Sequence, residues 1–305
     1  AENAVEDLLD LVRSANALPI GFIGSGFSRR YLKTPDWRGL LEYLASLTDE
    51  PLNRYLTQRQ RNQEDFYPDS ASEIASVFRT IWWKNAEYQS QRNDFSEQIG
   101  DISDPLKLQV AQYIKTFKIA DDPQIEKELQ SFQSARFQSF ITTNYDSLLE
   151  ELLPDYVCYH SQSEALFSPT YEMGEIYKIH GSIANFPSIT LTREDYHDYR
   201  ERNPYLTAKL LTYFVENPVL FFGYSLSDPH VQALLTELTQ CLTDVQLSTL
   251  NDRLIFIGRK SEDRPEELQR IPFLIEGHTF YVRQIGLEDW STLFMGLSDL
   301  PYHFA

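Results

Sequence analysis

Residues 18–28 read Leu-Pro-Ile-Gly-Phe-Ile-Gly-Ser-Gly-Phe-Ser, a short apolar run that ends in a glycine-rich turn. The residues before it, from Val5 to Ala15, place their apolar side chains largely on one helical face. The pattern therefore predicts a helix, a buried strand and a tight turn in succession. Glycines at such a turn let the backbone approach a phosphate, although two glycines alone are equally typical of a purely structural turn.

Strand and helix signals alternate again in the second half of the chain. Runs typical of strands occur at residues 137–142, 175–180, 217–223, 253–258 and 279–282. Helical patterns follow at residues 144–153, 231–242 and 265–270. The alternation predicts an α/β fold, with a Rossmann-like parallel sheet flanked by helices, because each right-handed crossover returns over a face of the sheet. The ligand of such a sheet lies beyond the carboxyl ends of its strands.

The stretch between the first and second predicted strands has a different character. Few β-branched runs occur from residue 51 to residue 136, whereas polar and aromatic residues at helical spacing are common. Prolines at positions 68, 105 and 123 predict breaks between its helices. We expect a single domain over residues 1–305, with a Rossmann-like core at about 1–50 and 137–305 and an inserted helical module at about 51–136.

Composition argues against several functional classes. A formal charge of −18 disfavours direct binding of nucleic acid, which needs a broad basic surface. The two cysteines, Cys158 and Cys241, cannot build a disulfide framework or a four-cysteine zinc site within the chain. No secretion signal and no membrane-spanning apolar run are present in the sequence. We expect a cytoplasmic protein that binds neither nucleic acid directly nor membranes.

Polar residues follow two of the predicted strands. Asn144 and Asp146 come directly after the strand at residues 137–142, and His180 ends the strand at residues 175–180. We expect them to converge with the glycine turn at one edge of the sheet. There an amide can hold water or ribose, a carboxylate can bind a carboxamide, and an imidazole can accept a proton from a hydroxyl or from water. Helix capping is the alternative for Asn144 and Asp146.

Another candidate loop follows the strand at residues 217–223. It reads Gly223-Tyr224-Ser225-Leu226-Ser227-Asp228-Pro229, and it can bind phosphate or ribose, with helix capping by Asp228 as the alternative. Four tyrosines fall in a predicted helical pair, and we interpret them as core or interface aromatics: Tyr196, Tyr199, Tyr205 and Tyr213.

Taken in order, these motifs resemble those of the sirtuin family. Gly24-Ser25-Gly26-Phe27-Ser28 resembles its Gly-Ala-Gly-x-Ser loop, and Thr34-Pro35-Asp36-Trp37-Arg38 resembles its Pro-Asp-Phe-Arg stretch. Thr142-Thr143-Asn144-Tyr145-Asp146 resembles Thr-Gln-Asn-Ile-Asp, Lys178-Ile179-His180-Gly181-Ser182 matches the catalytic His-Gly motif, and Gly223-Tyr224-Ser225 stands where the family has Gly-Thr-Ser. The chain lacks the four-cysteine zinc module of deacetylating sirtuins and carries a different helical segment. In both respects it resembles the defence-associated, sirtuin-like NAD+ hydrolases of bacteria.

The resemblance implies a role for each motif residue. Asn144 would orient the attacking water and the ribose, Asp146 would hold the nicotinamide carboxamide, and His180 would act through the ribose hydroxyls. The phosphates would be contacted by Gly24, Ser25, Gly26 and Ser28. Asp36 and Arg38 would border the nicotinamide pocket. The loop near the adenosine half would contribute Gly223, Ser225 and Asp228.

The implied activity is that of an NAD+ glycohydrolase, which releases nicotinamide and ADP-ribose and depletes NAD+ in anti-phage defence by abortive infection. NAD+ would be the substrate, and no zinc is expected. Two alternatives stay open: an NAD-dependent protein deacylase or ADP-ribosyltransferase, and a non-catalytic subunit that senses NAD or ADP-ribose. Implied partners are further copies of the chain and a separate sensor or activator, such as an ATPase, an Argonaute-like protein or a phage protein.

Overall fold

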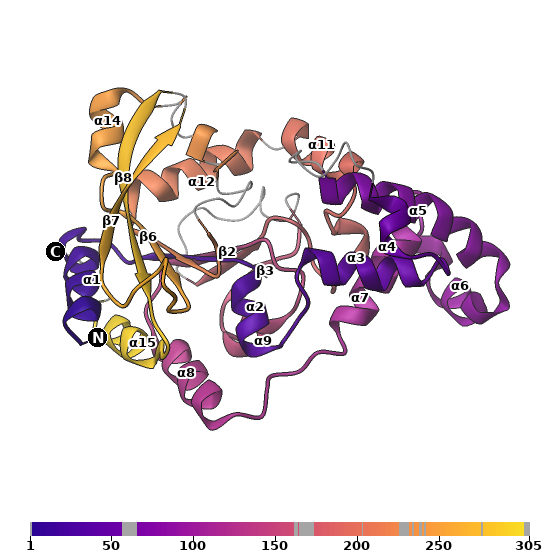
Figure 1. Ribbon diagram of the computed structural model, residues 1–305, viewed down its shortest axis with the longest axis horizontal. Helices are drawn as coiled ribbons and strands as arrows, with labels where there is room; N and C mark the ends of the chain where they lie inside the picture. The colour runs from indigo at the N-terminus through magenta and orange to yellow at the C-terminus, as the bar shows by residue number, and fades with distance from the viewer. Residues whose placement is uncertain are drawn as a thin grey trace.

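A mostly parallel sheet forms the centre of the molecule (Figure 1). The computed structural model describes residues 2–56, 66–161, 164, 174–202, 204–225, 232–233, 235–237, 240, 242–275 and 277–301. Within these residues the sheet has eight strands, in the order β3-β4-β2-β1-β5-β6-β8-β7. Their bounds are β1 Ile20–Ile23, β2 Ser139–Thr142, β3 Val157–Tyr159, β4 Glu175–Lys178, β5 Val219–Phe222, β6 Leu254–Gly258, β7 Gln269–Ile275 and β8 His278–Gly286. Only β7 and β8 pair in antiparallel fashion, so the predicted α/β, Rossmann-like fold is confirmed.

Helices cover both faces of this sheet, which explains its continuous apolar strands. The helices of the lower core in Figure 1 are α2 Ser25–Tyr31, α8 Pro123–Ser134, α9 Leu148–Leu152 and α15 Ser291–Ser298, with α1 Glu2–Ser14 joining them from the left of the view. Above the sheet lie α12 Pro204–Glu216 and α14 Asp244–Thr249. Successive residues of β1 alternate between these two cores, since Phe22 packs with the upper helices and Ile23 with the lower ones.

A separate hydrophobic cluster lies beside the sheet. It joins the helices α3 Trp37–Ser46, α4 Leu52–Tyr55, α5 Phe66–Lys84 and α7 Asp104–Ile114 to the chain around η3 Phe186–Ser188. The short elements η1 Ala86–Tyr88, α6 Gln89–Phe95 and η2 Ser96–Gln98 extend it, as the right side of Figure 1 shows. By contrast, α8 packs against α15 beneath the sheet. The division into a core and a module at 51–136 stays a prediction.

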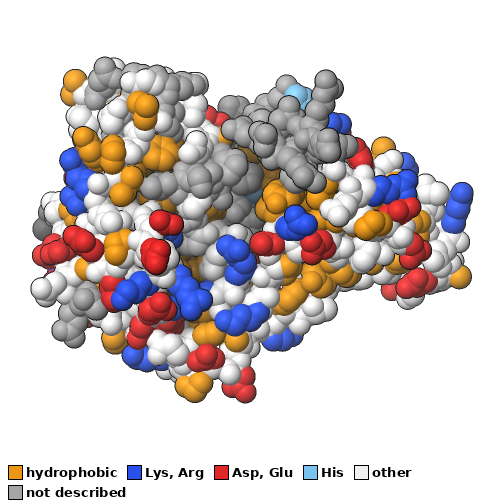
Figure 2. All heavy atoms as spheres, in the orientation of Figure 1, with side chains coloured by type: hydrophobic (Ala, Val, Ile, Leu, Met, Phe, Trp, Pro, Cys, Tyr) orange, Lys and Arg blue, Asp and Glu red, His pale blue; other side chains and the backbone are white. Residues whose placement is uncertain are grey.

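Several local features follow from the sequence. Asp36 caps α3, because its side chain accepts a hydrogen bond from the backbone N–H of Gly39 at 2.8 Å. The predicted helical pair is formed by α11 Arg193–Arg202 and α12. Among the described residues, no helix combines the length and the apolar character needed to span a bilayer. On the face drawn in Figure 2, Lys and Arg side chains are interspersed with Asp and Glu.

Other local predictions are wrong. The expected helix at residues 265–270 is absent, and the chain there enters β7, which contains Pro272. An edge strand tolerates proline, because only one of its sides pairs with a neighbouring strand. The helix expected from residue 144 begins only at Leu148. The predicted breaks at Pro68, Pro105 and Pro123 do fall at helix starts, because each proline lies in the first turn of a helix, where a missing N–H costs no helical bond. The helix expected at residues 231–242 falls largely outside the described residues.

Candidate active site

A cavity of about 670 Å³ opens at the carboxyl edge of the sheet. Its sheet-side wall comes from the segments that follow β1, β2, β4 and β5, including Ser25, Ser28, Asn144, Asp146, His180 and Tyr224. The cavity is also lined by Asp36, Trp37, Tyr67, Ile114, Tyr196 and Tyr199. The structure therefore brings residues of four separate sequence motifs to one cavity, at the edge of the sheet expected for a parallel α/β fold.

Glycines allow the backbones after β1 and β5 to touch. The N–H of Gly24 donates to the carbonyl of Phe222 at 2.8 Å, and the N–H of Gly26 donates to the carbonyl of Gly223 at 3.1 Å. A Cβ atom on Gly26 would lie 2.7 Å from the Cα of Gly223, whose φ of +77° also favours glycine. These two amide groups are thus used within the protein, and the glycines are required for close packing of the two loops.

Ser28 links two of the predicted site residues. Its hydroxyl donates to Oδ2 of Asp146 at 2.6 Å and accepts from Nδ2 of Asn144 at 2.8 Å. Nδ2 of Asn144 also donates to the carbonyl of Gly24 at 2.9 Å. We call Ser28, Asn144 and Asp146 the Ser28 trio. Both amide hydrogens of Asn144 are engaged, so its Oδ1 is the group that can receive a bond from a ligand.

The carboxylate of Asp146 combines a structural contact with access to the cavity. Its Oδ1 accepts from the backbone N–H of Leu148 at 3.1 Å, which is a contact at the start of α9. Asp146 therefore also holds the backbone just before α9, whose N-cap residue is Ser147. Because a carboxylate offers about four acceptor positions, the two bonds leave capacity for a ligand donor. The side chain is nearly buried, since the residue is 9% exposed.

Lys178 holds the loop that carries Asn144 and Asp146. Its ammonium group, which is almost fully buried, donates to the carbonyls of Asp146 and Tyr145 and forms an ion pair with Oε1 of Glu150 at 2.8 Å. Burial raises the pKa of Tyr145, which keeps its hydroxyl as the donor to the carbonyl of Thr190 at 2.6 Å. The sequence motif contained Lys178 without predicting this role, because its partners lie far along the chain.

His180 lies on the cavity wall between two aromatic rings. It is 4% exposed, and its ring meets those of Tyr196 and Tyr199 edge-on, at centroid distances of 5.4 and 5.2 Å. The turn after it needs glycine, since Gly181 has a φ of +83° and a Cβ there would lie 2.1 Å from the carbonyl oxygen of Ser188. Burial raises the pKa of Tyr199, which favours its neutral form. The two tyrosines are thus cavity residues, a placement that their polar sequence surroundings did not indicate.

Some predicted residues lie away from the cavity wall. Arg38 pairs with Glu42 at 3.0 Å on the exposed side of α3. Ser225 is exposed and does not line the cavity, although Tyr224 beside it does. The hydroxyl of Tyr224 shares a hydrogen bond of 2.6 Å with that of Thr143. Asp228 lies outside the described residues.

Comparison with known proteins identifies a family model that covers three of the sequence motifs. Residues 138–273 match the family model of the SIR2-like domain. This segment contains the Asn144, Asp146 and His180 motifs together with Gly223. The resemblance to the sirtuin-like family is therefore confirmed.

Three curated relatives share the name NAD(+) hydrolase ThsA. The protein of Cytobacillus dafuensis is 30% identical over 105 residues, which cover 33% of this chain and 21% of that protein. That of Enterococcus faecium is 26% identical over 132 residues, 41% of this chain and 27% of the relative. That of Bacillus cereus (strain MSX-D12) is 26% identical over 136 residues, which cover 43% of this chain and 27% of the relative. The similarity thus spans between 21% and 27% of the length of these relatives.

Proposed function

Since residues 138–273 match the SIR2-like domain, we propose that this protein is an NAD+ glycohydrolase, which cleaves the bond between nicotinamide and ribose. The observation that carries the proposal is the placement of the Ser28 trio and His180 on the wall of one cavity. The name of the relatives, NAD(+) hydrolase, supports the same substrate.

The reaction needs groups that the cavity can supply. The bond between C1′ of the ribose and the nicotinamide nitrogen breaks, and its electron pair neutralises the pyridinium. Positive charge develops on the ribose, water attacks C1′, and a proton leaves the attacking water. Well-placed polar side chains can lower the barrier of such a step through orientation and electrostatic stabilisation.

Each group of the site receives one task in this proposal. Oδ1 of Asn144 orients the water and the ribose, because both of its amide hydrogens are already engaged. The carboxylate of Asp146 accepts a hydrogen bond from the nicotinamide carboxamide, and Ser28 holds it in place. His180 takes up the proton through a ribose hydroxyl, a role typically worth about 10²–10⁴-fold in rate. Ser25, which lines the cavity, contacts a phosphate, and Asp36 borders the nicotinamide end.

The biological setting is also a proposal. The resemblance to bacterial defence proteins supports a cytoplasmic effector that depletes NAD+ during phage infection. Such an effector must be held inactive until it is triggered. We therefore propose that further copies of the chain or a separate sensor, such as an ATPase, an Argonaute-like protein or a phage protein, control it.

The decisive experiment is chromatographic analysis of NAD+ after incubation with the protein, with and without candidate activators. Nicotinamide and ADP-ribose should form in equal amounts with the unaltered chain. Asn144→Ala and His180→Ala should each lower the rate by about 10²-fold or more. His197→Ala is the matched control, because this histidine is exposed on the same helix as Tyr196 and should leave the rate unchanged. Cleavage at the unaltered rate in both site variants would refute the assignment.

A second arm separates the alternatives. An acetylated lysine peptide is added, and the release of nicotinamide is compared with and without it. Acceptor-independent release supports the glycohydrolase. Release that depends on the peptide would indicate a deacylase, and tight NAD+ binding without turnover in the presence of the activator would indicate a sensing subunit.

A further inference from the structure

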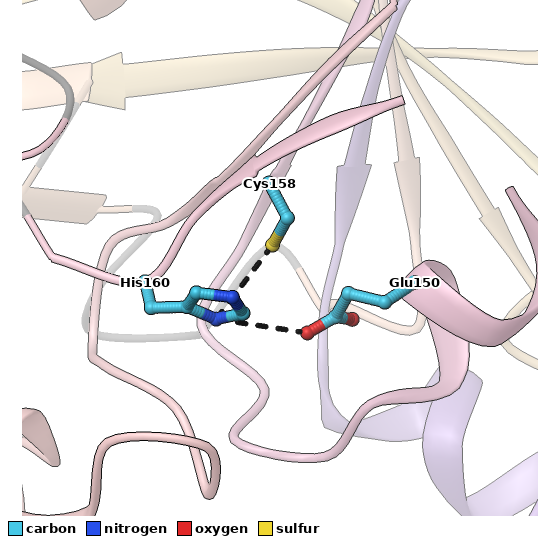
Figure 3. A group of neighbouring side chains, drawn as sticks. All are labelled: Glu150, Cys158 and His160. Atoms are coloured by element: carbon cyan, nitrogen blue, oxygen red, sulfur yellow. Dashed lines mark hydrogen bonds and ion pairs between the residues drawn. The ribbon is translucent and has the colours of Figure 1, made fainter. Parts of the chain in front are cut away.

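Three side chains that can bind metal ions meet between α9 and the end of β3 (Figure 3). Sγ of Cys158 lies 3.8 Å from Nδ1 of His160, and this nitrogen lies 3.9 Å from Oε1 of Glu150. One donor atom of each residue lies within 4.8 Å of those of the other two. We call these residues the Cys158 cluster.

Local structure explains why the three side chains converge. Cys158 lies in the middle of β3, and His160 follows two residues later, so both side chains leave the same face of this edge strand. Glu150 comes from α9, the helix that precedes β3. Figure 3 shows the three side chains pointing toward one another from these two elements.

The carboxylate of Glu150 has an unused acceptor. Its Oε1 is paired with Lys178, but its Oε2 is buried and has no hydrogen-bond partner among the described residues. Buried polar atoms in folded proteins are nearly always bonded, so a carboxylate that keeps one buried oxygen without a partner, in a group with a thiol and an imidazole, indicates an absent ligand. A cation satisfies this oxygen, whereas an anion would be repelled by it.

We propose that Glu150, Cys158 and His160 bind a Zn²⁺ ion. Sulfur, imidazole nitrogen and carboxylate oxygen are the three ligand types that zinc accepts in proteins. In a tetrahedral site with bonds of about 2.0–2.3 Å, neighbouring ligand atoms lie roughly 3.3–3.8 Å apart. The observed separations of 3.8 and 3.9 Å therefore need only small adjustments. The site differs from a four-cysteine module, since three protein ligands leave a fourth position for water.

The surrounding charges suit a divalent ion. Lys178 contributes one positive charge next to Glu150, but the carboxylate of Glu164 accepts from the backbone N–H of His160 at 2.8 Å. With a thiolate at Cys158, the positive charges of the ion and Lys178 balance the negative charges of Cys158, Glu150 and Glu164. Burial and the nearby Glu150 raise the pKa of Cys158 to about 12, so zinc binding would release the thiol proton.

Cobalt provides a direct test, because Co²⁺ bound to a thiolate absorbs in the near ultraviolet. The purified full chain, freed of metal with a chelator, is titrated with Co²⁺ and then with Zn²⁺. One equivalent of Co²⁺ should produce the thiolate band, and Zn²⁺ should displace it. Cys158→Ser should abolish the band, and Glu150→Gln and His160→Gln should each weaken binding by about tenfold or more. No NAD+ is needed, so the result does not depend on the proposed function.

Matched variants keep the test decisive. Cys241→Ser and His197→Gln should bind Co²⁺ as the unaltered chain does. Metal-free variants are compared by circular dichroism, and the result is judged on those that keep the spectrum of the metal-free parent. Because His160 is partly exposed, His160→Gln should disturb the metal-free fold little. A band that survives Cys158→Ser, a band lost in Cys241→Ser, or no binding at micromolar metal would overturn the proposal.

Discussion

Two glutamates, the buried Glu128 and the half-buried Glu150, differ in how completely their carboxylates are bonded. Both oxygens of Glu128 are bonded, by the guanidinium of Arg30 at 2.5 and 2.7 Å, by the hydroxyl of Tyr31 at 2.9 Å and by the backbone N–H of Trp290 at 3.2 Å. Glu150 has one oxygen paired with Lys178 and one that is buried without a partner among the described residues.

The difference separates a structural ion pair from a candidate binding group. The contacts of Glu128 join α2, α8 and the start of α15. Burial lowers the pKa of Arg30, but the hydrogen bond and charge of Glu128 raise it above its usual value. Glu150 keeps an acceptor available beside Cys158 and His160. Complete bonding therefore indicates stability, and incomplete bonding indicates room for a ligand.

Glu128→Gln should give the largest loss of stability. The amide cannot accept both guanidinium bonds, and it leaves the charge of Arg30 uncompensated in a largely buried position. We expect the free energy of unfolding to fall by about 3–5 kcal/mol, as measured by urea titration. Glu126→Gln on the exposed side of the same helix should change it by less than about 0.5 kcal/mol. Equal effects of the two substitutions would contradict the structural role.

Ser28→Ala should have an intermediate effect on stability and a strong effect on activity. The substitution removes the bond to the Asp146 carboxylate and one partner of Asn144. We expect a loss of about 1.5–3 kcal/mol in urea, because the lost bond involves a charged group. If the proposed function is correct, NAD+ cleavage should also fall by about 10²-fold. Ser134→Ala on the surface of α8 is the control, and a full rate in Ser28→Ala would show that the Ser28 trio does not position the reacting groups.

Glu150→Gln should cost less stability than Glu128→Gln in metal-free buffer. The buried ammonium group of Lys178 loses the negative charge that compensates it, but it keeps its bonds to two backbone carbonyls and can still donate to the amide oxygen, so we expect a loss of about 1–2 kcal/mol in urea. Added zinc should separate the two chains. At a free Zn²⁺ concentration of about 100 times the dissociation constant, the free energy of unfolding of the unaltered chain should rise by about 2.7 kcal/mol and that of the variant by much less. Glu151→Gln, the exposed neighbour on α9, should retain the full zinc effect. Equal stabilisation of Glu150→Gln would remove Glu150 from the site.

The position of the candidate active site could be predicted from the sequence because it follows from topology. Parallel strands end at one edge, so the motifs containing Ser28, Asn144 and His180 had to meet there. The short helix α2 was missed, because its seven residues give too little periodicity and include Gly26. The strand β7 was missed, because Pro272 and the polar residues before it are unlike a strand pattern.

The two glutamates could not be distinguished from sequence. Arg30 lies 98 residues from Glu128, and Lys178 lies 28 residues from Glu150, so the pairs depend on tertiary packing. The Cys158 cluster was missed for a related reason. Its spacing matches no common zinc motif, and the chain contains only two cysteines. A convergence of ligands from a helix and an edge strand becomes visible only in three dimensions.

The smallest effect should come from Asp289, which extends the well-bonded network around Glu128 to the start of α15. Burial alone would raise the pKa of Asp289, but hydrogen bonds from Ser291 and Gln124 and the charge of Lys127 lower it to about 2. A carboxyl group with a lowered pKa favours folding while it is ionised, and this contribution is lost as the pH falls from about 4, its unfolded value, toward 2.

Asp289→Asn should therefore reduce stability slightly at pH 7 and flatten the loss of stability between pH 4 and pH 2, as measured by urea titration across that range. The effect stays small because this side chain is more than a third exposed and its ion pair with Lys127 is screened by solvent. Asp299→Asn at the exposed end of α15 is the control and should leave the loss of stability between pH 4 and pH 2 unchanged. If Asp289→Asn and the unaltered chain lost the same stability between pH 4 and pH 2, the bonded network would end at Glu128, because Asp289 would then add nothing to it.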